Sequence, residues 1–170
     1  MLEMWLNFGA VILTQFLLFI VHAYYEKRIS DIPHILCWSI IIGIPFGILF
    51  DIVVGEFFGL YSYQLGSGAF FLTINGALSY GLMQANVFLM QRARMVHFYI
   101  WALIVGVVYE MSNHYFRVWT WEFGSFWFET FIVHTFGYIG LAIFMAFVWH
   151  FILGHKFTFI ENARKGHWSI

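Results

Sequence analysis

Apolar runs alternate with short polar breaks along the whole chain. Five of the runs are long enough for a helix to cross a bilayer, which takes about 20 residues. The breaks between them are too short to hold a second domain, and we therefore expect one all-α membrane domain of five transmembrane helices. These helices are predicted near residues 5–24, 33–54, 69–91, 97–116 and 127–151.

The end of the chain repeats a plan that is already present in its middle. Asp51 and Glu110 each lie near the end of an apolar run, and a glycine-rich hinge follows each acid. Each hinge contains two aromatic residues one position apart. These pairs are Tyr61 and Tyr63 in the first hinge, and Trp119 and Trp121 in the second.

A further apolar run completes each copy, with Asn75 in the first and Glu129 and His134 in the second. We interpret the chain as two helix–hinge–helix units behind one leading helix. The expected divisions are a leading helix at 1–28, repeat one at 33–94, repeat two at 96–155 and a cytosolic tail at 156–170.

Composition excludes an ordinary soluble domain. Hydrophobic residues make up 62% of the chain and charged residues 10%, whereas soluble domains carry about 25% charged residues. A net charge of -1 offers no basic face for nucleic acid. The single cysteine, Cys37, cannot form an internal disulfide, and we expect it to be a small core residue.

The basic residues predict the orientation in the cell membrane. Seven of the eight Lys and Arg residues follow the first, third and fifth runs, and Arg117 alone lies on the other side. Cytoplasmic loops are rich in Lys and Arg, so the N-terminus is expected outside and the C-terminus in the cytoplasm. Both units then run in the same direction, as in parallel repeats related by an axis along the membrane normal.

Acids and imidazoles inside membrane-length segments are costly unless they are paired or functional. We therefore predict a polar, aromatic-walled pocket between the two units, open toward the outer leaflet. The candidate catalytic residues are Asp51, Glu110 and Glu129. The candidate binding residues are Tyr61, Tyr63, Trp119, Trp121, Asn75, His134 and Arg117.

Each candidate also has a structural interpretation. The acids could accept hydrogen bonds from the hinges or pair with Arg117, and the aromatic pairs could form an interfacial belt. Glu110 and His114 are four residues apart and share a helix face. With Glu129 and His134 they could bind a metal, but the spacing is no recognised metal signature, and we predict neither a metal nor a cofactor.

An acid that closes a helix, an aromatic-x-aromatic hinge and a Leu-Gly before the next helix resemble the membrane carotenoid-modifying proteins. These are the heterodimer-type lycopene cyclase domains and the carotenoid hydratases. The matching residues are Asp51, 58–63 and 65–66 in one copy, and Glu110, 119–121 and 123–124 in the other. The Pro-x-Glu-Glu element of the cyclase domains is absent, and Glu129 is the acid that remains in that region.

The resemblance implies proton-initiated chemistry on a polyene. An acid, Glu110 or Asp51, would donate the proton, and aromatic ring faces would stabilise the carbocation.

Three hypotheses on function follow. The first is a small membrane protein that binds or modifies an isoprenoid or another lipid in the outer-leaflet pocket. The second is a non-enzymatic subunit or scaffold that packs against a membrane protein partner or a second copy of itself. The third is a small ion-coupled transporter that uses the acids. Replacing Glu110 and Asp51 by Gln and Asn separates the second hypothesis from the other two, because a scaffold would not need the carboxylates.

Overall fold

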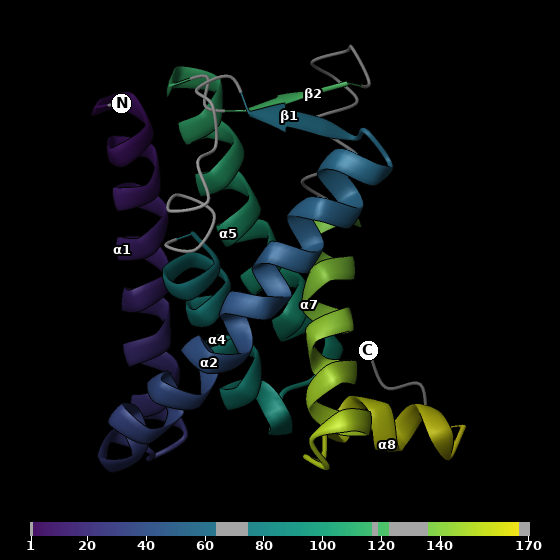
Figure 1. Ribbon diagram of the computed structural model, residues 1–170. Helices are drawn as coiled ribbons and strands as arrows, with labels where there is room; N and C mark the ends of the chain where they lie inside the picture. Colours follow the sequence, from purple (N-terminus) through teal and green to yellow (C-terminus); the bar gives the residue numbers. More distant parts are fainter. Residues whose placement is uncertain (1, 64–74, 117–118, 123–135, 167–170) are drawn as a thin grey trace.

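A computed structural model describes residues 2–63, 75–116, 119–122 and 136–166 of the chain. These residues are mostly helical, and the long helices run along one common direction (Figure 1). The elements are α1 (Leu2–Tyr25), η1 (Ile29–Asp31), α2 (Ile32–Phe50), η2 (Asp51–Phe57), β1 (Tyr61–Tyr63), η3 (Asn75–Tyr80), α4 (Gly81–Leu89), η4 (Met90–Arg92), α5 (Met95–Phe116), β2 (Trp119–Trp121), α7 (Tyr138–Phe147), η6 (Val148–Ile152) and α8 (Thr158–Arg164).

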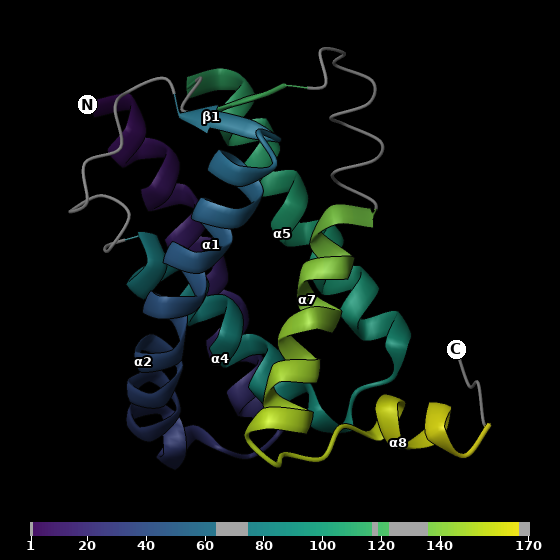
Figure 2. The same cartoon turned by 45° about the vertical axis from the view of Figure 1, so that its right-hand side comes forward.

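Two strands modify the all-α prediction. β1 and β2 form an antiparallel ribbon at the end of the bundle where α1 begins, and α8 lies across the opposite end (Figures 1 and 2). The second predicted helix was expected to end near residue 54. Instead, η2 carries the helix on to Phe57 as a π-helix, a form that is frequent at functional sites.

Helix α4 forms the centre of the bundle. It contacts α1, α2 and α7, and nearly all of its residues are buried. Gly81 of α4 allows α2 to approach closely. A Cβ on Gly81 would lie 3.2 Å from the Ile40 backbone. The main core lies between α4, α5 and α7 and includes Met83, Val87, Met90, Phe98, Trp101, Val105, Met145 and Trp149.

The C-terminal segment belongs to this core. Phe157 and Ile160 are buried, and the Phe157 ring lies 6.3 Å from that of Phe98 on α5. The tail predicted at 156–170 is therefore packed against the bundle over its described residues.

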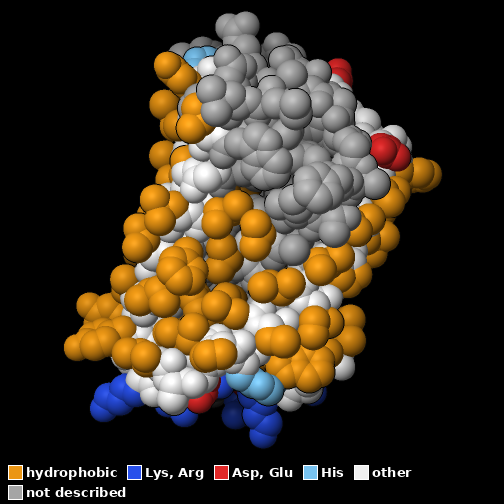
Figure 3. Space-filling view, turned by 60° about the vertical axis from the view of Figure 1, so that its left-hand side comes forward, with side chains coloured by type: hydrophobic (Ala, Val, Ile, Leu, Met, Phe, Trp, Pro, Cys, Tyr) orange, Lys and Arg blue, Asp and Glu red, His pale blue; other side chains and the backbone are white. Residues whose placement is uncertain are grey.

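Large apolar side chains cover the outside of the bundle. Figure 3 shows them over one face, with Lys and Arg gathered at the end that carries α8. Cys37 belongs to this exposed surface, so the expectation that it lies in the core is wrong. The exposed apolar side chains include Leu13, Leu17, Trp38, Ile41, Leu49, Phe144, Phe147 and Phe151.

Two described stretches, Ile29–Phe57 and Met95–Tyr115, are long and apolar enough to cross a membrane. Gly9–Tyr25 and Tyr138–Ile152 are apolar but shorter. The third predicted span begins at residue 69, and its described part begins at Asn75. Five spans therefore stay a prediction.

Candidate functional site

The two aromatic hinges pair with each other. Tyr61 lies opposite Trp121, Ser62 opposite Thr120, and Tyr63 opposite Trp119. The midpoint of this register falls between Ser62 and Thr120, and a two-fold rotation there exchanges the two strands. Hinges that are 58 residues apart in sequence (119 − 61 = 58, 121 − 63 = 58) thus become neighbours across one short ribbon.

Asp51 contacts the first strand of this ribbon. It begins η2, its side chain is buried, and its Oδ1 accepts hydrogen bonds from the hydroxyls of Tyr61 and Tyr80. The Tyr80 bond is 3.3 Å long. A Cβ on Gly55 would lie 3.3 Å from the Tyr61 ring, and the missing side chain therefore lets that ring reach back to the helix that carries the acid.

Glu110 has an equivalent arrangement on α5. The Trp121 indole donates to its Oε2 at 3.1 Å, and the Tyr138 hydroxyl donates to its Oε1 at 2.9 Å. Gly106, one turn earlier on the same helix, provides the room for this contact, because a Cβ there would lie 2.8 Å from the Tyr138 ring. Glu110 is 8% exposed, so both bonds lie in an apolar setting.

Each acid is therefore held by one donor from its own hinge and by one tyrosine from the helix that follows. The two tyrosines, Tyr80 and Tyr138, are missing from the sequence-based set of site residues. They are 58 residues apart (138 − 80 = 58), the same offset as the hinge aromatics. Extending the hinge alignment to the next helix would have found them.

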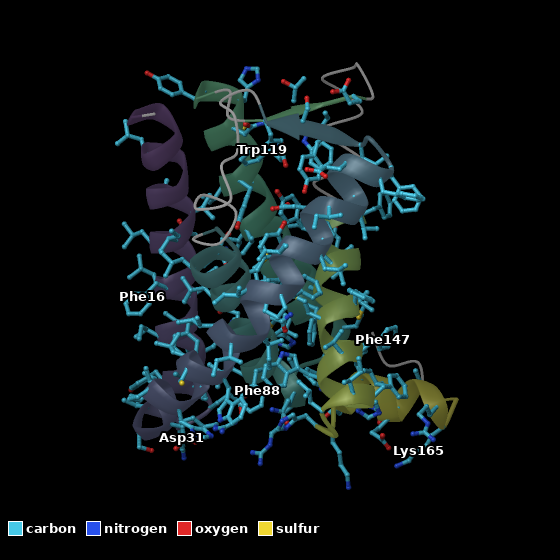
Figure 4. The ribbon with its side chains drawn as sticks, in the orientation of Figure 1. Phe16, Asp31, Phe88, Trp119, Phe147 and Lys165 are labelled. Atoms are coloured by element: carbon cyan, nitrogen blue, oxygen red, sulfur yellow. The ribbon has the colours of Figure 1, made fainter. Side chains whose placement is uncertain are left out.

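Asn113 fixes the second strand to α5. Its Nδ2 donates to the Trp119 carbonyl, its Oδ1 accepts from the Trp119 backbone N–H, and both distances are 2.9 Å. This paired contact sets the position of Trp119, which is buried. Figure 4 labels Trp119 at the ribbon end of the bundle.

Aromatic rings surround the two acids. The Tyr61 and Trp121 rings meet edge to face with centroids 5.3 Å apart. The Tyr109 ring lies 5.5 Å from that of Tyr138 and 6.2 Å from that of Trp119. Edge-to-face and tilted pairs at such distances stabilise each other beyond simple burial, and these contacts join both units into one cluster.

The leading helix also contributes to this cluster. Gln15 of α1 is buried and donates from Nε2 to the Tyr109 hydroxyl at 3.1 Å. Nothing in the repeat pattern points to Gln15, because α1 has no counterpart in either unit. Its polarity within an otherwise apolar run was the available signal.

The structure brings together five of the predicted site residues, namely Asp51, Tyr61, Glu110, Trp119 and Trp121. For Tyr63 and Asn75, only the positions in β1 and η3 are described. Arg117, Glu129 and His134 lie outside the described residues. Among the residues that the structure describes, no group of three His, Cys, Asp or Glu could hold a metal ion.

Comparisons of this chain with models of protein families, with curated proteins and with solved structures gave no match. The resemblance to carotenoid-modifying proteins therefore stays a prediction. What the site can do follows from its own chemistry: two buried carboxyl groups, each oriented by N–H or O–H donors, within an aromatic cluster.

Proposed function

We propose that the protein crosses the cell membrane five times, with the ribbon end outside and the α8 end in the cytoplasm. The apolar outer surface supports insertion, since bilayer lipid would cover it. The orientation follows from Lys and Arg at the α8 end (Figure 3), because cytoplasmic loops are rich in these residues.

The two units behind the leading helix form parallel repeats in this proposal. The ribbon supports a two-fold axis along the bundle, since its register is symmetric about the pair Ser62 and Thr120. Binding sites in repeat-built membrane proteins lie where the repeats meet. In this proposal, the two acids and the aromatic rings around them lie at the boundary between the two repeats.

The function that this arrangement supports best is binding or modification of an isoprenoid or a similar lipid-type molecule. One observation carries the proposal: each unit holds a buried acid with two ring donors inside a shared aromatic cluster. An apolar ligand would pack against ring faces, and ring faces attract the positive charge that a polyene acquires on protonation.

The proposed modification would need only carboxyl groups and aromatic rings of the protein itself. A proton from the Glu110 or Asp51 carboxyl group would add to a double bond and leave a carbocation beside a carboxylate. Loss of a proton from a neighbouring carbon to that carboxylate would form a new double bond and restore the acid. The Tyr61, Trp119 and Trp121 rings would stabilise the cation in between.

Native mass spectrometry combined with lipid extraction tests this proposal on protein purified in mild detergent. We expect a co-purifying polyene or isoprenoid that is reduced in Glu110→Gln and in Asp51→Asn. Glu161→Gln, in α8 at the other end, is the matched control and should retain the ligand. Protein that carries no isoprenoid, or the same amount in all variants, would refute the proposal.

A proton-coupled carrier is the second candidate, and a chain of polar contacts favours it. The Tyr109 hydroxyl accepts from the Gln15 side chain, the backbone carbonyl of Gln15 accepts from Asn86 at 3.1 Å, and Asn86 contacts His22 at 2.9 Å. These contacts run from the acid cluster toward the opposite end. Proton flux into liposomes that disappears in Gln15→Leu, together with lipid extracts free of isoprenoid, would favour the carrier.

A further inference from the structure

A cavity of about 500 Å³ lies at the α8 end of the bundle, far from the ribbon. Its polar lining comes from three places along the chain: His22 on α1 with Glu26 in the turn that follows, Arg92 and Arg94 around η4, and His97 on α5. Leu89 and Met90 form part of its apolar wall. Small-molecule sites have volumes of about 300–1,000 Å³, so this cavity can hold more than a simple ion.

The two cavity arginines form no ion pair with any residue in the described part of the chain. Arg28, at the same end, differs from them. Its guanidinium bonds Asp31 at 2.9 Å and lies 5.0 Å from the centre of the Phe88 ring. Arg28 therefore has a structural role, whereas Arg92 and Arg94 keep their donors available to a ligand.

His22 is held in one orientation at the cavity wall. The Asn86 Nδ2 donates to two carbonyls, those of Gln15 at 3.1 Å and Leu82 at 2.9 Å. Carbonyls only accept, so this amide end must be the nitrogen, and Oδ1 faces the His22 Nδ1 at 2.9 Å. An amide oxygen also only accepts, so Nδ1 carries the hydrogen and Nε2 is the ring nitrogen that can serve a ligand.

We propose that this cavity binds a phosphate group that is attached to an apolar molecule. Two arginines supply planar N–H donors of the kind that match phosphate oxygens. Leu89 and Met90 provide the apolar contact, and His22 and His97 lie in the same wall. The phosphate could belong to a lipid of the inner leaflet or to a soluble apolar phosphate compound.

Replacing Glu26 should change phosphate binding in the opposite direction to replacing the arginines. Its carboxylate lines the same cavity and repels an anion. Removing this charge should therefore strengthen binding of phosphate, an effect that misfolding cannot imitate. The Arg92→Gln/Arg94→Gln protein should weaken binding about tenfold or more, because it loses two charge-assisted contacts.

Native mass spectrometry of protein released from nanodiscs tests the lipid source. The nanodiscs contain phosphatidylcholine with or without added phosphatidic acid. Retained phosphatidic acid should fall in Arg92→Gln/Arg94→Gln and rise in Glu26→Gln. Lys156→Gln/Lys165→Gln is the matched control, because it removes the same charge from exposed positions at the same end. It should leave retention unchanged.

Titration calorimetry of detergent-solubilised protein with an alkyl phosphate tests the soluble source. If the alkyl phosphate binds and phosphatidic acid is not selectively retained, the ligand is a soluble compound. If phosphatidic acid is retained and the alkyl phosphate does not bind, the ligand is a lipid headgroup. The proposal is overturned if neither probe binds. It is also overturned if the arginine variant equals the lysine control, or if Glu26→Gln does not bind more tightly.

Discussion

Replacing Tyr138 by phenylalanine should show whether Glu110 is a charged carboxylate in the folded protein. The Tyr138 hydroxyl donates to Glu110 Oε1 at 2.9 Å, and phenylalanine keeps the ring and its contact with Tyr109. A hydrogen bond to a charged group contributes about 1.5–3 kcal/mol, and one between neutral groups about 0.5–1.5 kcal/mol. A loss in the larger range would show a charged carboxylate, whereas the proton-donating role proposed for Glu110 predicts a loss in the smaller range.

The measurement is the free energy of unfolding in mixed micelles, on a double-mutant cycle of Tyr138→Phe and Glu110→Gln. The cycle isolates the energy of this one pair from other effects of each substitution. Tyr80→Phe is the internal comparison. Its bond to Asp51 is 3.3 Å long, beyond the usual O–H···O distance of about 2.5–3.0 Å, so the loss should be smaller.

Two results would refute this reasoning. A coupling energy within about 0.5 kcal/mol of zero would mean that the hydroxyl does not bond Glu110 in solution, since that is the usual limit of additivity. If Tyr80→Phe lowers the free energy of unfolding as much as Tyr138→Phe does, the lengths of the two tyrosine–carboxyl hydrogen bonds do not report their strength.

Three further predictions concern packing, the ribbon and pH. Gly106→Ala should lower the free energy of unfolding by about 1–3 kcal/mol, because the new Cβ would overlap the Tyr138 ring. Gly140 has open space around it, so Gly140→Ala should raise the free energy of unfolding by about 0.5–1 kcal/mol in the same assay. Asn113→Ala removes both hydrogen bonds to the Trp119 backbone, so it should lower the free energy of unfolding by about 1–3 kcal/mol. Amide exchange at residues 119–121 should become faster, and unchanged exchange would contradict this prediction. Burial, and then repulsion from Arg28, lower the pKa of His155 below 6.5, so its stabilising contribution is complete above pH 6.5 and decreases as the pH falls below that value. Protection of the amides around residues 153–157, measured as exchange relative to the intrinsic rate at each pH, should therefore decrease below pH 6.5, and less so in His155→Gln.

Much of the helical architecture is visible in the sequence. Long apolar runs predict helices because a buried or lipid-covered backbone must satisfy its own hydrogen bonds, and a helix does so locally. The acids and hinges were found in the same way, since carboxyl groups stand out against apolar neighbours. Asp51 and Glu110 are both buried in the structure.

The partners of those acids were less visible. Each acid bonds a hinge aromatic and a tyrosine that lies about 30 residues further along the chain in sequence (80 − 51 = 29, 138 − 110 = 28). A tyrosine in an apolar run looks like any core or interface residue. Its hydroxyl becomes meaningful only when the packing of two helices brings it to a carboxyl oxygen.

The ribbon shows why the rest required the tertiary structure. β1 and β2 are three residues each, too short to be predicted from local preference, and their partners are 56–60 residues apart (119 − 63 = 56, 121 − 61 = 60). By itself, the sequence determined that two similar hinges exist and that each follows an acid. Only the tertiary packing decided that the hinges pair, because strand pairing depends on backbone groups that every residue carries alike.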